Sequence, residues 1–309
     1  MHCIKPTLLY FDDEQASAER LALAADLNLA CIERHRFPDE EIKLRLPDTL
    51  PDRVVVMRSL HQPNEKLLEL LLTCQTARQL GAKHLVLVAP YLGYMRQDKA
   101  FQSGEAISQE IIGRFLAQLF DAIITVDPHL HRVKLLQQAI PATQAIAISA
   151  APLLSDVIAA RRTNPILIGP DEESLQWVSI AAARHHFEFS VCRKIRLGDH
   201  AVQIKLPQIS VLGRHVVLMD DVASTGQTFA STAQLLGGAG AKSLAVAVTH
   251  ALFAQDAIQK IRRAGVQEIW STDSIPHASN VIYLASCLAD AIGKIYGELE
   301  FTSKRQDFS

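Results

Sequence analysis

Short apolar runs and segments of helical periodicity alternate along the whole chain. The runs are rich in Val, Ile and Leu, which predicts strands buried on both faces of a sheet. The expected strands are Val54–Met57, Leu85–Ala89, Ala122–Val126, Ile166–Ile168, Val216–Met219 and Leu244–Val248. The expected helices are Glu65–Leu80, Ser108–Leu119, Pro152–Ala160, Ser174–His185, Thr228–Leu236 and Asp256–Ala264. This alternation predicts an α/β fold with mainly parallel sheets flanked by helices.

The chain also contains an internal repeat. Residues 81–88 match residues 240–247 in step, and Thr73 falls opposite Thr232. Each copy reads as a helix, a glycine that ends it and a buried strand. Such junctions are common, so chance similarity is the competing explanation, but the matched order of neighbouring elements favours duplication. Two related domains would have a cleft between them, where small ligands often bind.

Composition narrows the class of protein. The 309 residues suffice for two domains of common size, and 49% hydrophobic with 21% charged residues is an ordinary globular composition. A net charge of −2 gives no electrostatic case for nucleic acid or an anionic membrane. No apolar run reaches the length of a membrane span or resembles a signal peptide. The scattered cysteines predict reduced thiols in a cytoplasmic protein.

The most informative stretch runs from His215 to Phe229. A strand-like run is followed by Asp220 and Asp221, and then by a small-residue turn that leads into a helix. Ligands of open α/β sheets bind at the carboxyl ends of strands, and such a turn offers backbone N–H groups to a phosphate. Carboxylates suit ribose hydroxyls or a hard cation such as Mg²⁺. We interpret the stretch as a sugar-phosphate site; the alternative is that the aspartates merely end a strand.

Two further motifs contain candidate binding residues. The segment Arg36–Glu41 lies between strand-like segments and is predicted to form a turn, although in isolation it would read as a solvated acidic loop. Arg96 and Gln97 follow the expected strand Leu85–Ala89, where ligands are expected. An arginine fork there could bind phosphate or stack on a base, and surface charge is the alternative.

Two other strand ends carry possible metal ligands. His129 follows the strand Ala122–Val126, and Asp171 follows the strand Ile166–Ile168. A lone histidine is usually structural, so these two residues could share a metal only if their strand ends face each other.

Lys194 and Arg196 lie between strand-like residues 187–192 and 202–206. The segment is either an exposed hairpin tip or a mobile lid, with Gly198 as a hinge, that brings positive charge onto a polyphosphate. Alternation in an extended segment places the two cations on one face.

Taken together, in this order and spacing, the motifs resemble those of the ribose-phosphate pyrophosphokinase family, closer to its archaeal-type members than to the classical bacterial pattern. The resemblance runs from about Phe37 to Ile292. It implies formation of phosphoribosyl diphosphate and AMP from ATP and ribose 5-phosphate with Mg²⁺. It also implies two type I phosphoribosyltransferase-like domains, residues 1–147 and 148–289, with residues 290–309 returning to the first and the active site in the cleft.

The resemblance assigns roles residue by residue. It implies that Lys194, Arg196 and His129 are catalytic. It implies that ATP is bound by Phe37, Asp39, Glu41, Arg96 and Gln97, the first three reaching the adenine held by a neighbouring subunit of a homo-oligomer. It implies that ribose 5-phosphate is bound by Asp220, Asp221, Ser224, Thr225, Gly226, Gln227 and Thr228. The implied metal ligands are His129, Asp171, Asp220 and Asp221.

The chain departs from the family pattern in three places. Residues 102–106 replace an arginine-rich segment, Glu172 and Glu173 replace glycines after Asp171, and Pro128 and Leu130 change the surroundings of His129. Extra carboxylates beside a polyphosphate would repel ATP unless they point away or recruit a cation. Two alternatives therefore stay open: a catalytically silent regulatory paralogue, and a phosphoribosyltransferase that consumes phosphoribosyl diphosphate. Lys194 and Arg196 argue against the transferase, which needs no ATP-activating arm.

Overall fold

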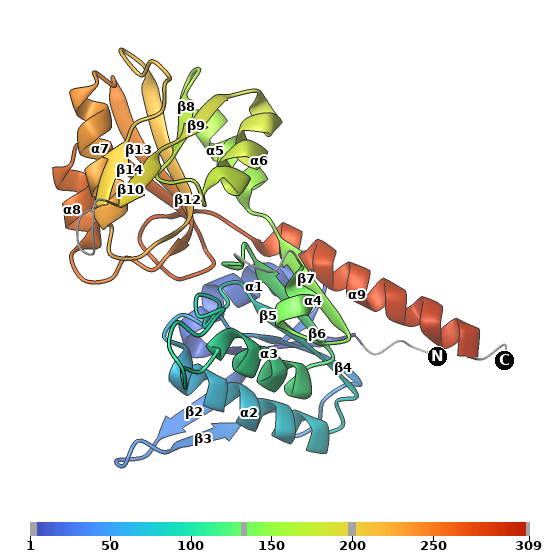
Figure 1. The fold of residues 1–309 in the computed structure, drawn as a ribbon. Helices are drawn as coiled ribbons and strands as arrows, with labels where there is room; N and C mark the ends of the chain where they lie inside the picture. Colours follow the sequence, from blue (N-terminus) through green and yellow to red (C-terminus); the bar gives the residue numbers. More distant parts are fainter. Residues whose placement is uncertain (1–4, 131–134, 197–201, 307–309) are drawn as a thin grey trace. The chain divides into compact units, whose positions relative to one another are not determined.

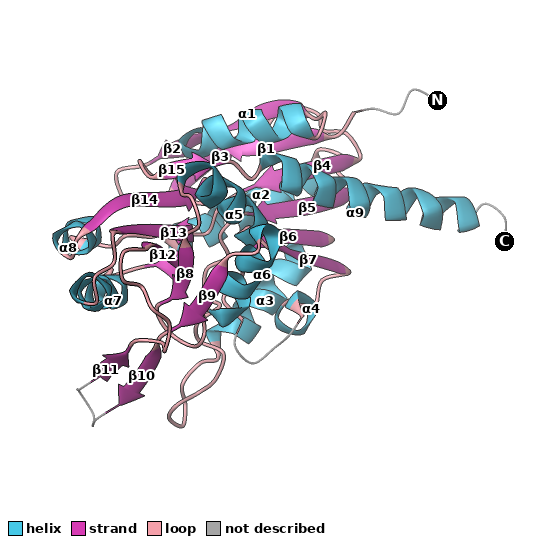
Figure 2. Ribbon diagram, turned by 90° about the horizontal axis from the view of Figure 1, so that it is seen from above, coloured by secondary structure: helices cyan, strands magenta, loops and turns pink. Residues whose placement is uncertain are grey.

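The computed structural model describes residues 5–130, 135–196 and 202–306, and these form two compact units. Unit 1 comprises Met1–Ile148 and Leu284–Ser309, and unit 2 comprises Ser149–Tyr283. Both are α/β structures with sheets flanked by helices (Figures 1 and 2), which confirms the predicted fold class.

Unit 1 contains a seven-stranded sheet in the order β3-β2-β1-β4-β5-β6-β7. All neighbours are parallel except the hairpin of β2 and β3. The strands are β1 (Thr7–Phe11), β2 (Asn28–Arg36), β3 (Ile42–Arg45), β4 (Arg53–Met57), β5 (His84–Ala89), β6 (Ala122–Val126) and β7 (Gln144–Ile148). The helices are α1 (Gln15–Ala24), α2 (Pro63–Gln79), α3 (Ser108–Leu119), α4 (Leu136–Ala139) and α9 (Ala285–Gln306).

Strand side chains of unit 1 alternate between two apolar faces. Leu9, Val56 and Leu87 pack in one core cluster with Leu70 of α2 and Leu116 of α3. Helices α1 and α9 contact each other, and α9 also contacts β6 and β7. Because both faces are covered, the central strands are apolar at nearly every position, as the sequence pattern indicated.

Unit 2 contains a parallel six-stranded sheet in the order β15-β14-β13-β12-β8-β9. The strands are β8 (Ile166–Gly169), β9 (Glu188–Val191), β12 (His215–Ala223), β13 (Ser243–Ala251), β14 (Val266–Thr272) and β15 (Asn280–Ile282). One core cluster packs against α5 (Ala151–Arg161) and α6 (Leu175–His185), and another packs against α7 (Gln227–Gly238) and α8 (Ala257–Arg263). A separate antiparallel hairpin joins β10 (Arg193–Arg196) to β11 (Val202–Lys205).

The repeat is visible in the architecture. The order β2-β1-β4-β5-β6-β7 in unit 1 matches β9-β8-β12-β13-β14-β15 in unit 2. At the repeated glycine, Gly81 has φ 109° and Gly240 has φ 86°. The N–H of Ala82 donates to the Ala77 carbonyl at 3.0 Å, and that of Ala241 to the Leu236 carbonyl at 3.1 Å. In both units, these bonds end the helix in the same way, with a glycine in the left-handed conformation.

One helix of the repeat is supplied from a different part of the chain. In unit 2, α5 precedes the first strand and contacts α6, β13 and β15. In unit 1 the corresponding helix is α9, the last in the sequence, which contacts α1 and β7. The carboxyl-terminal helix thus covers the sheet face that would otherwise be bare beside α1.

Among the differences between predicted and observed boundaries, two concern candidate site residues. Strand β12 does not end at Met219 but continues to Ala223, because its ladder with β13 extends to the Ala223–Ala251 pair. Asp220 and Asp221 therefore lie within a strand. Lys194 and Arg196 lie in strand β10, paired with Ile204 and Val202, and not in a hairpin tip. The tip itself, with Gly198, falls outside the described residues.

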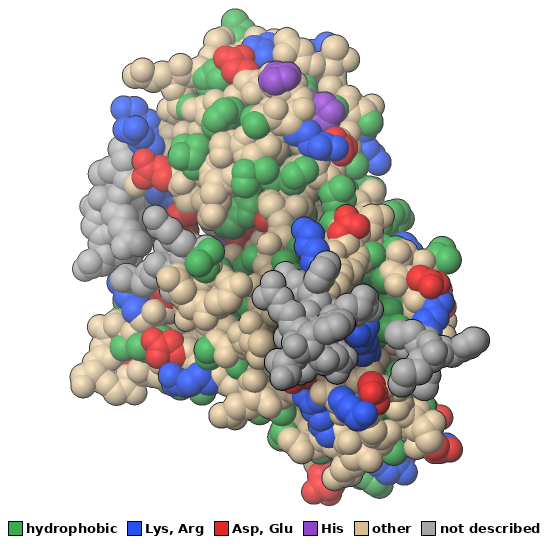
Figure 3. Space-filling model, turned by 90° about the vertical axis from the view of Figure 1, so that its right-hand side faces the viewer, with side chains coloured by type: hydrophobic (Ala, Val, Ile, Leu, Met, Phe, Trp, Pro, Cys, Tyr) green, Lys and Arg blue, Asp and Glu red, His purple; other side chains and the backbone are tan. Residues whose placement is uncertain are grey.

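The surface matches the mixed composition. On the face drawn in Figure 3, acidic and basic side chains are interspersed among polar and apolar ones. Among the described residues, no helix is both long enough and apolar enough to span a bilayer. The described cysteines, Cys31, Cys74, Cys192 and Cys287, are free thiols.

Candidate active site

The acidic pair lies at the centre of the sheet of unit 2. Strand β12 is flanked by β8, which ends at Gly169, and by β13, whose Val248 pairs with Asp220. Asp221 is only 2% exposed, and its N–H donates to Asp220 Oδ1 at 2.9 Å. Burial, followed by the charges of Asp221 and Asp171, raises the pKa of Asp220 well above its usual value. Like-charged carboxylates held this close are a favourable environment for a cation.

Asp171 is held by the turn that follows β8. Its Oδ1 accepts hydrogen bonds from the N–H groups of Glu173 and Ser174 at 3.1 and 3.3 Å. A Cβ at Gly169 would approach Ser174 Oγ to 2.1 Å, so the tight turn requires glycine there. The carboxylate is thereby oriented before any ligand binds.

Lys194 contacts this carboxylate directly, because its Nζ lies 2.5 Å from Asp171 Oδ2. On the same strand, Arg193 Nε lies 3.4 Å from Glu172 Oε1, and both of these side chains are exposed. Glu172 is therefore paired with a neighbouring cation, which offsets part of the repulsion expected from its charge. The structure brings Asp171, Lys194 and the acidic pair to one edge of unit 2.

The small-residue turn joins β12 to α7. Gly226 has φ 72°, and a Cβ there would lie 3.0 Å from the Ala257 carbonyl oxygen. The N–H groups of Phe253 and Ala254 donate to the carbonyls of Ala223 and Ser224 at 2.8 and 3.0 Å, which fixes the start of the turn. Helix α7 begins at Gln227, whose N–H donates to Thr225 Oγ1 at 3.5 Å, and the first turn of the helix leaves N–H groups without partners within the helix. The predicted phosphate loop thus has the expected strand-turn-helix context.

In unit 1, the predicted turn forms the tip of the β2–β3 hairpin. The N–H of Phe37 donates to the Glu41 carbonyl at 2.8 Å, and the N–H of Glu40 donates to the Phe37 carbonyl at 2.9 Å. Asp39 Oδ1 accepts from the N–H of Glu41 at 3.3 Å. The Phe37 ring is 39% exposed, with the ring of His35 edge-on at 4.8 Å. Figure 1 shows the β2–β3 tip projecting from the body of unit 1.

Arg96 and Gln97 lie on the loop that follows β5. The loop is fixed by the N–H of Leu60, which donates to the Tyr91 carbonyl at 2.8 Å, and by Gln109 Nε2, which donates to the Met95 carbonyl at 3.1 Å. Arg96 is exposed at its surface.

His129 follows β6 after Asp127, whose N–H donates to the Ile148 carbonyl at 2.8 Å and whose φ is 35°. It belongs to unit 1, whereas Asp171 belongs to unit 2. Their shared role at a metal therefore stays a prediction.

Comparisons with known proteins identify the family. A model described as the N-terminal domain of ribose phosphate pyrophosphokinase matches residues 7–119, and a phosphoribosyl transferase domain model matches residues 137–281. A protein of Methanopyrus kandleri named ribose-phosphate pyrophosphokinase is 35% identical over 282 residues, which cover 90% of this chain and 95% of that protein. The chain belongs to the ribose-phosphate pyrophosphokinase family.

Other relatives agree with this membership. Ribose-phosphate pyrophosphokinase 2 of Archaeoglobus fulgidus is 34% identical over 275 residues, covering 89% of this chain and 96% of that protein. These archaeal relatives confirm the resemblance to archaeal-type members. The crystal structure of phosphoribosylpyrophosphate synthetase from Mycobacterium smegmatis superposes with a TM-score of 0.81 over 95% of this chain and 99% of that one. At 22% identity, that match supports the fold alone.

The sequence motifs missed one group of polar residues. Arg58, Glu69 and Glu14 are almost completely buried in unit 1 and contact one another or a shared partner. None of the sequence motifs includes them. One sequence signal of a polar contact was available. Glu65 and Glu69 are four residues apart on a helix, and Arg34 and Arg36 are two residues apart on a strand, so the two pairs can face each other.

Proposed function

We propose that the protein transfers the β,γ-diphosphoryl group of ATP to the anomeric hydroxyl of ribose 5-phosphate, giving phosphoribosyl diphosphate and AMP. Family membership over both domains supports this reaction. The structural observation that carries it is the Asp220–Asp221 pair, with Asp220 half-buried and Asp221 buried, on the strand that leads into the Gly226 turn and α7. This arrangement offers carboxylates to ribose hydroxyls and N–H groups to the 5-phosphate of one sugar phosphate.

The same edge fits Mg²⁺. Asp171, Asp220 and Asp221 are hard oxygen ligands. Burial first, and then the charges of Asp221 and Asp171, raise the pKa of Asp220, and a bound cation would offset that negative charge. Within the described ranges, no group of three or more candidate ligands is arranged to hold a metal by itself. That fits Mg²⁺, which usually binds one or two carboxylates together with substrate phosphates. When bound, it would neutralise charge on the transferring phosphate oxygens.

Lys194 and Arg196 are proposed to stabilise charge on the transferring diphosphoryl group. Lys194 lies beside Asp171, so in the absence of substrate its charge is balanced by that carboxylate. Phosphoryl transfer depends on positioning and charge neutralisation more than on a covalent nucleophile, and cations on a separate hairpin suit that need. Arg96 and Gln97 are proposed to bind ATP, and Phe37, Asp39 and Glu41 to contact the adenine held by a second copy of the chain. His129 stays a predicted ligand and catalytic residue.

A single assay tests the reaction. Incubation with Mg²⁺, ATP and ribose 5-phosphate is expected to yield equimolar AMP and phosphoribosyl diphosphate. Release of ADP, or no turnover by folded protein, would contradict the proposal. No turnover would favour the silent paralogue, and consumption of added phosphoribosyl diphosphate with a nucleobase would favour the transferase.

Replacing Asp221 with alanine is expected to weaken ribose 5-phosphate binding by about tenfold or more at fixed Mg²⁺, with a smaller effect on ATP, because one charged hydrogen bond is worth about 1.5–3 kcal/mol. Isothermal titration calorimetry with each ligand measures both affinities. Asp156→Ala on α5, whose carboxylate pairs with Arg184 at 2.6 Å, is the control. Unchanged sugar-phosphate affinity in Asp221→Ala would remove Asp221 from the site.

Replacing Phe37 with alanine is expected to raise the KM for ATP several-fold without unfolding the protein, because the ring lies outside the core cluster of its unit and a lost aromatic contact is worth about 0.5–1.5 kcal/mol. Steady-state kinetics at saturating ribose 5-phosphate measure it. Sedimentation at assay concentration is expected to show an oligomer, and a fully active monomer would contradict the second-copy role.

A further inference from the structure

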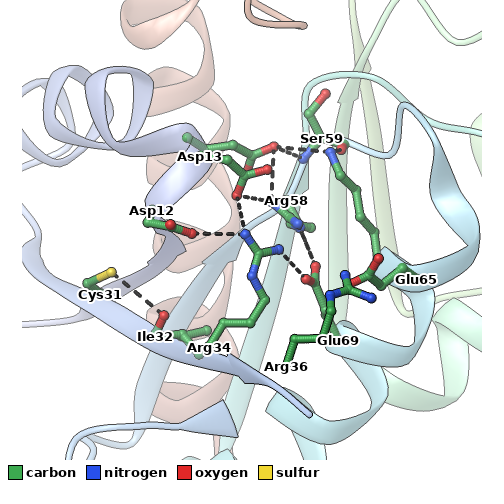
Figure 4. A network of polar contacts seen from close by, with 12 residues as sticks. Asp12, Asp13, Cys31, Ile32, Arg34, Arg36, Arg58, Ser59, Glu65 and Glu69 are labelled. Atoms are coloured by element: carbon green, nitrogen blue, oxygen red, sulfur yellow. Dashed lines mark hydrogen bonds and ion pairs between the residues drawn. The ribbon is translucent and has the colours of Figure 1, made fainter. Parts of the chain in front are cut away.

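The β2–β3 hairpin is tied to helix α2 by two ion pairs in step. Arg34 Nη1 lies 2.5 Å from Glu69 Oε1, and Arg36 pairs with Glu65 (Figure 4). The glutamates are four residues apart on the helix, a rise of about 6 Å, and the arginines are two apart on the strand, a rise of about 6.6 Å. The spacings match closely enough for both pairs to form at once. We name this set of four residues the hairpin clamp.

The inner pair of the clamp is anchored in the core. Glu69 is fully buried, and its Oε2 also accepts from Arg58 Nε at 2.7 Å. Arg58 is 1% exposed, its guanidinium lies 4.4 Å from the centre of the Phe11 ring, and its Nη1 donates to Asp13 at 2.7 Å. Charges that are buried and fully paired keep one geometry, since any movement would leave a charge unpaired.

The outer pair of the clamp lies next to the tip. Arg36 directly precedes Phe37, and the side chains of Arg36 and Glu65 are 47% and 40% exposed. Strand β3 hydrogen-bonds to no strand but β2 within the described part of the sheet. The direction of the tip therefore depends on how β2 is held, and the Arg36–Glu65 pair joins β2 to α2 directly before the tip.

We propose that Glu65 and Arg36 are positioning residues that orient the Phe37–Glu41 tip for its contact with the adenine of ATP. This inference rests on the proposed function, because it assumes that the tip contacts the nucleotide. Neither residue needs to touch ATP. Their effect is on the geometry of the tip, where a displacement of about 1 Å can be costly.

A charge swap tests the clamp. Arg36→Glu and Glu65→Arg are each expected to raise the KM for ATP about tenfold, while kcat and the KM for ribose 5-phosphate change less than about twofold. The double variant restores the pair in reverse and is expected to return the KM for ATP to within about threefold of the parent. Arg45→Glu is the matched control, because Arg45 pairs with Glu33 at 3.6 Å in the same hairpin without contacting the clamp.

Hydrogen exchange of the tip amides separates this inference from the proposed function. Faster exchange of the hydrogen-bonded amides of Phe37, Glu40 and Glu41 in both single variants, with recovery in the double variant, is expected even if the wild type makes no phosphoribosyl diphosphate. Two results would overturn the clamp: unchanged exchange and unchanged KM in the single variants, or losses that the double variant does not recover. If the clamp holds while the wild type lacks turnover, only the proposed function fails.

Discussion

Lys194→Ala and Arg196→Ala are each expected to lower kcat by about a hundredfold, with little change in the KM for ATP or for ribose 5-phosphate. Charge builds up on the diphosphoryl group in the transition state, and a cation that acts only there contributes to kcat and not to ground-state binding. The structure supports this separation for Lys194, whose Nζ lies 2.5 Å from Asp171 and is thus already neutralised before substrate binds. Arg196 lies two positions further along the same strand.

Steady-state kinetics of the purified variants provide the measurement, and Arg193→Ala is the matched control. Arg193 is also a cation of β10, but its side chain is exposed and pairs with Glu172. It is expected to change kcat by less than about threefold, in keeping with the small energies of exposed ion pairs. A raised KM with kcat preserved would make Lys194 and Arg196 docking charges. Full activity in both variants would mean that the hairpin is merely solvated.

The central strands and helices could be predicted from the sequence because they are bounded by local signals. Residues 122–126 and 108–119 form a strand and a helix with the predicted bounds. Strand β12 was misjudged because two aspartates break its apolar pattern. What keeps Asp220 and Asp221 extended is the ladder with β13, an interaction between residues far apart in sequence. Tertiary pairing of this kind overrides local preference.

The sequence predicted the candidate site as a set of residue types at strand ends. The roles of these residues in binding and catalysis stay predictions. The buried cluster of unit 1 could not be found this way, because Arg58 and Asp13 are 45 positions apart and look like surface charges until the fold joins them. Charged residues are rarely buried unless they are paired. Because their partners are distant in sequence, the local sequence gives no sign that these residues are buried.

The register of the two sheets places opposite charges at equivalent positions of the two units. Thr7 of β1 pairs with Val54 of β4, and Ile166 of β8 pairs with Val216 of β12. Counting four residues on from Val54 and from Val216 reaches Arg58 in unit 1 and Asp220 in unit 2. In unit 1 the arginine is neutralised by the unit's own carboxylates, whereas in unit 2 the carboxylates outnumber their cations and are suited to an external ion.

The buried charged cluster of unit 1 leads to a second prediction, in which Glu14 makes the stability of the fold depend on pH. This side chain is 3% exposed, its Oε1 accepts from the N–H of Ser59 at 2.8 Å, and Arg58 Nη1 and Lys66 Nζ lie 3.8 and 3.9 Å away. Burial outweighs the attraction of Arg58 and Lys66 and raises the pKa of the carboxyl to about 7. The folded state therefore keeps a proton that the unfolded chain, with the ordinary pKa of 4.5, releases.

The free energy of unfolding should consequently fall through this group as the pH rises from about 4.5 to about 7, by up to about 3 kcal/mol. Glu14→Gln keeps the acceptor for the Ser59 N–H but cannot ionise, so it should not show this loss. His61, whose pKa burial lowers to about 4, gives the opposite slope between about pH 4 and 6.5. Both proteins retain that slope, so it cancels in their difference. Urea unfolding followed by circular dichroism from about pH 5 to 7 should show the free energy of unfolding of the variant increasing relative to that of the wild type as the pH rises. Parallel curves would mean that Glu14 is already ionised in the folded protein at pH 5, with Arg58 and Lys66 outweighing its burial.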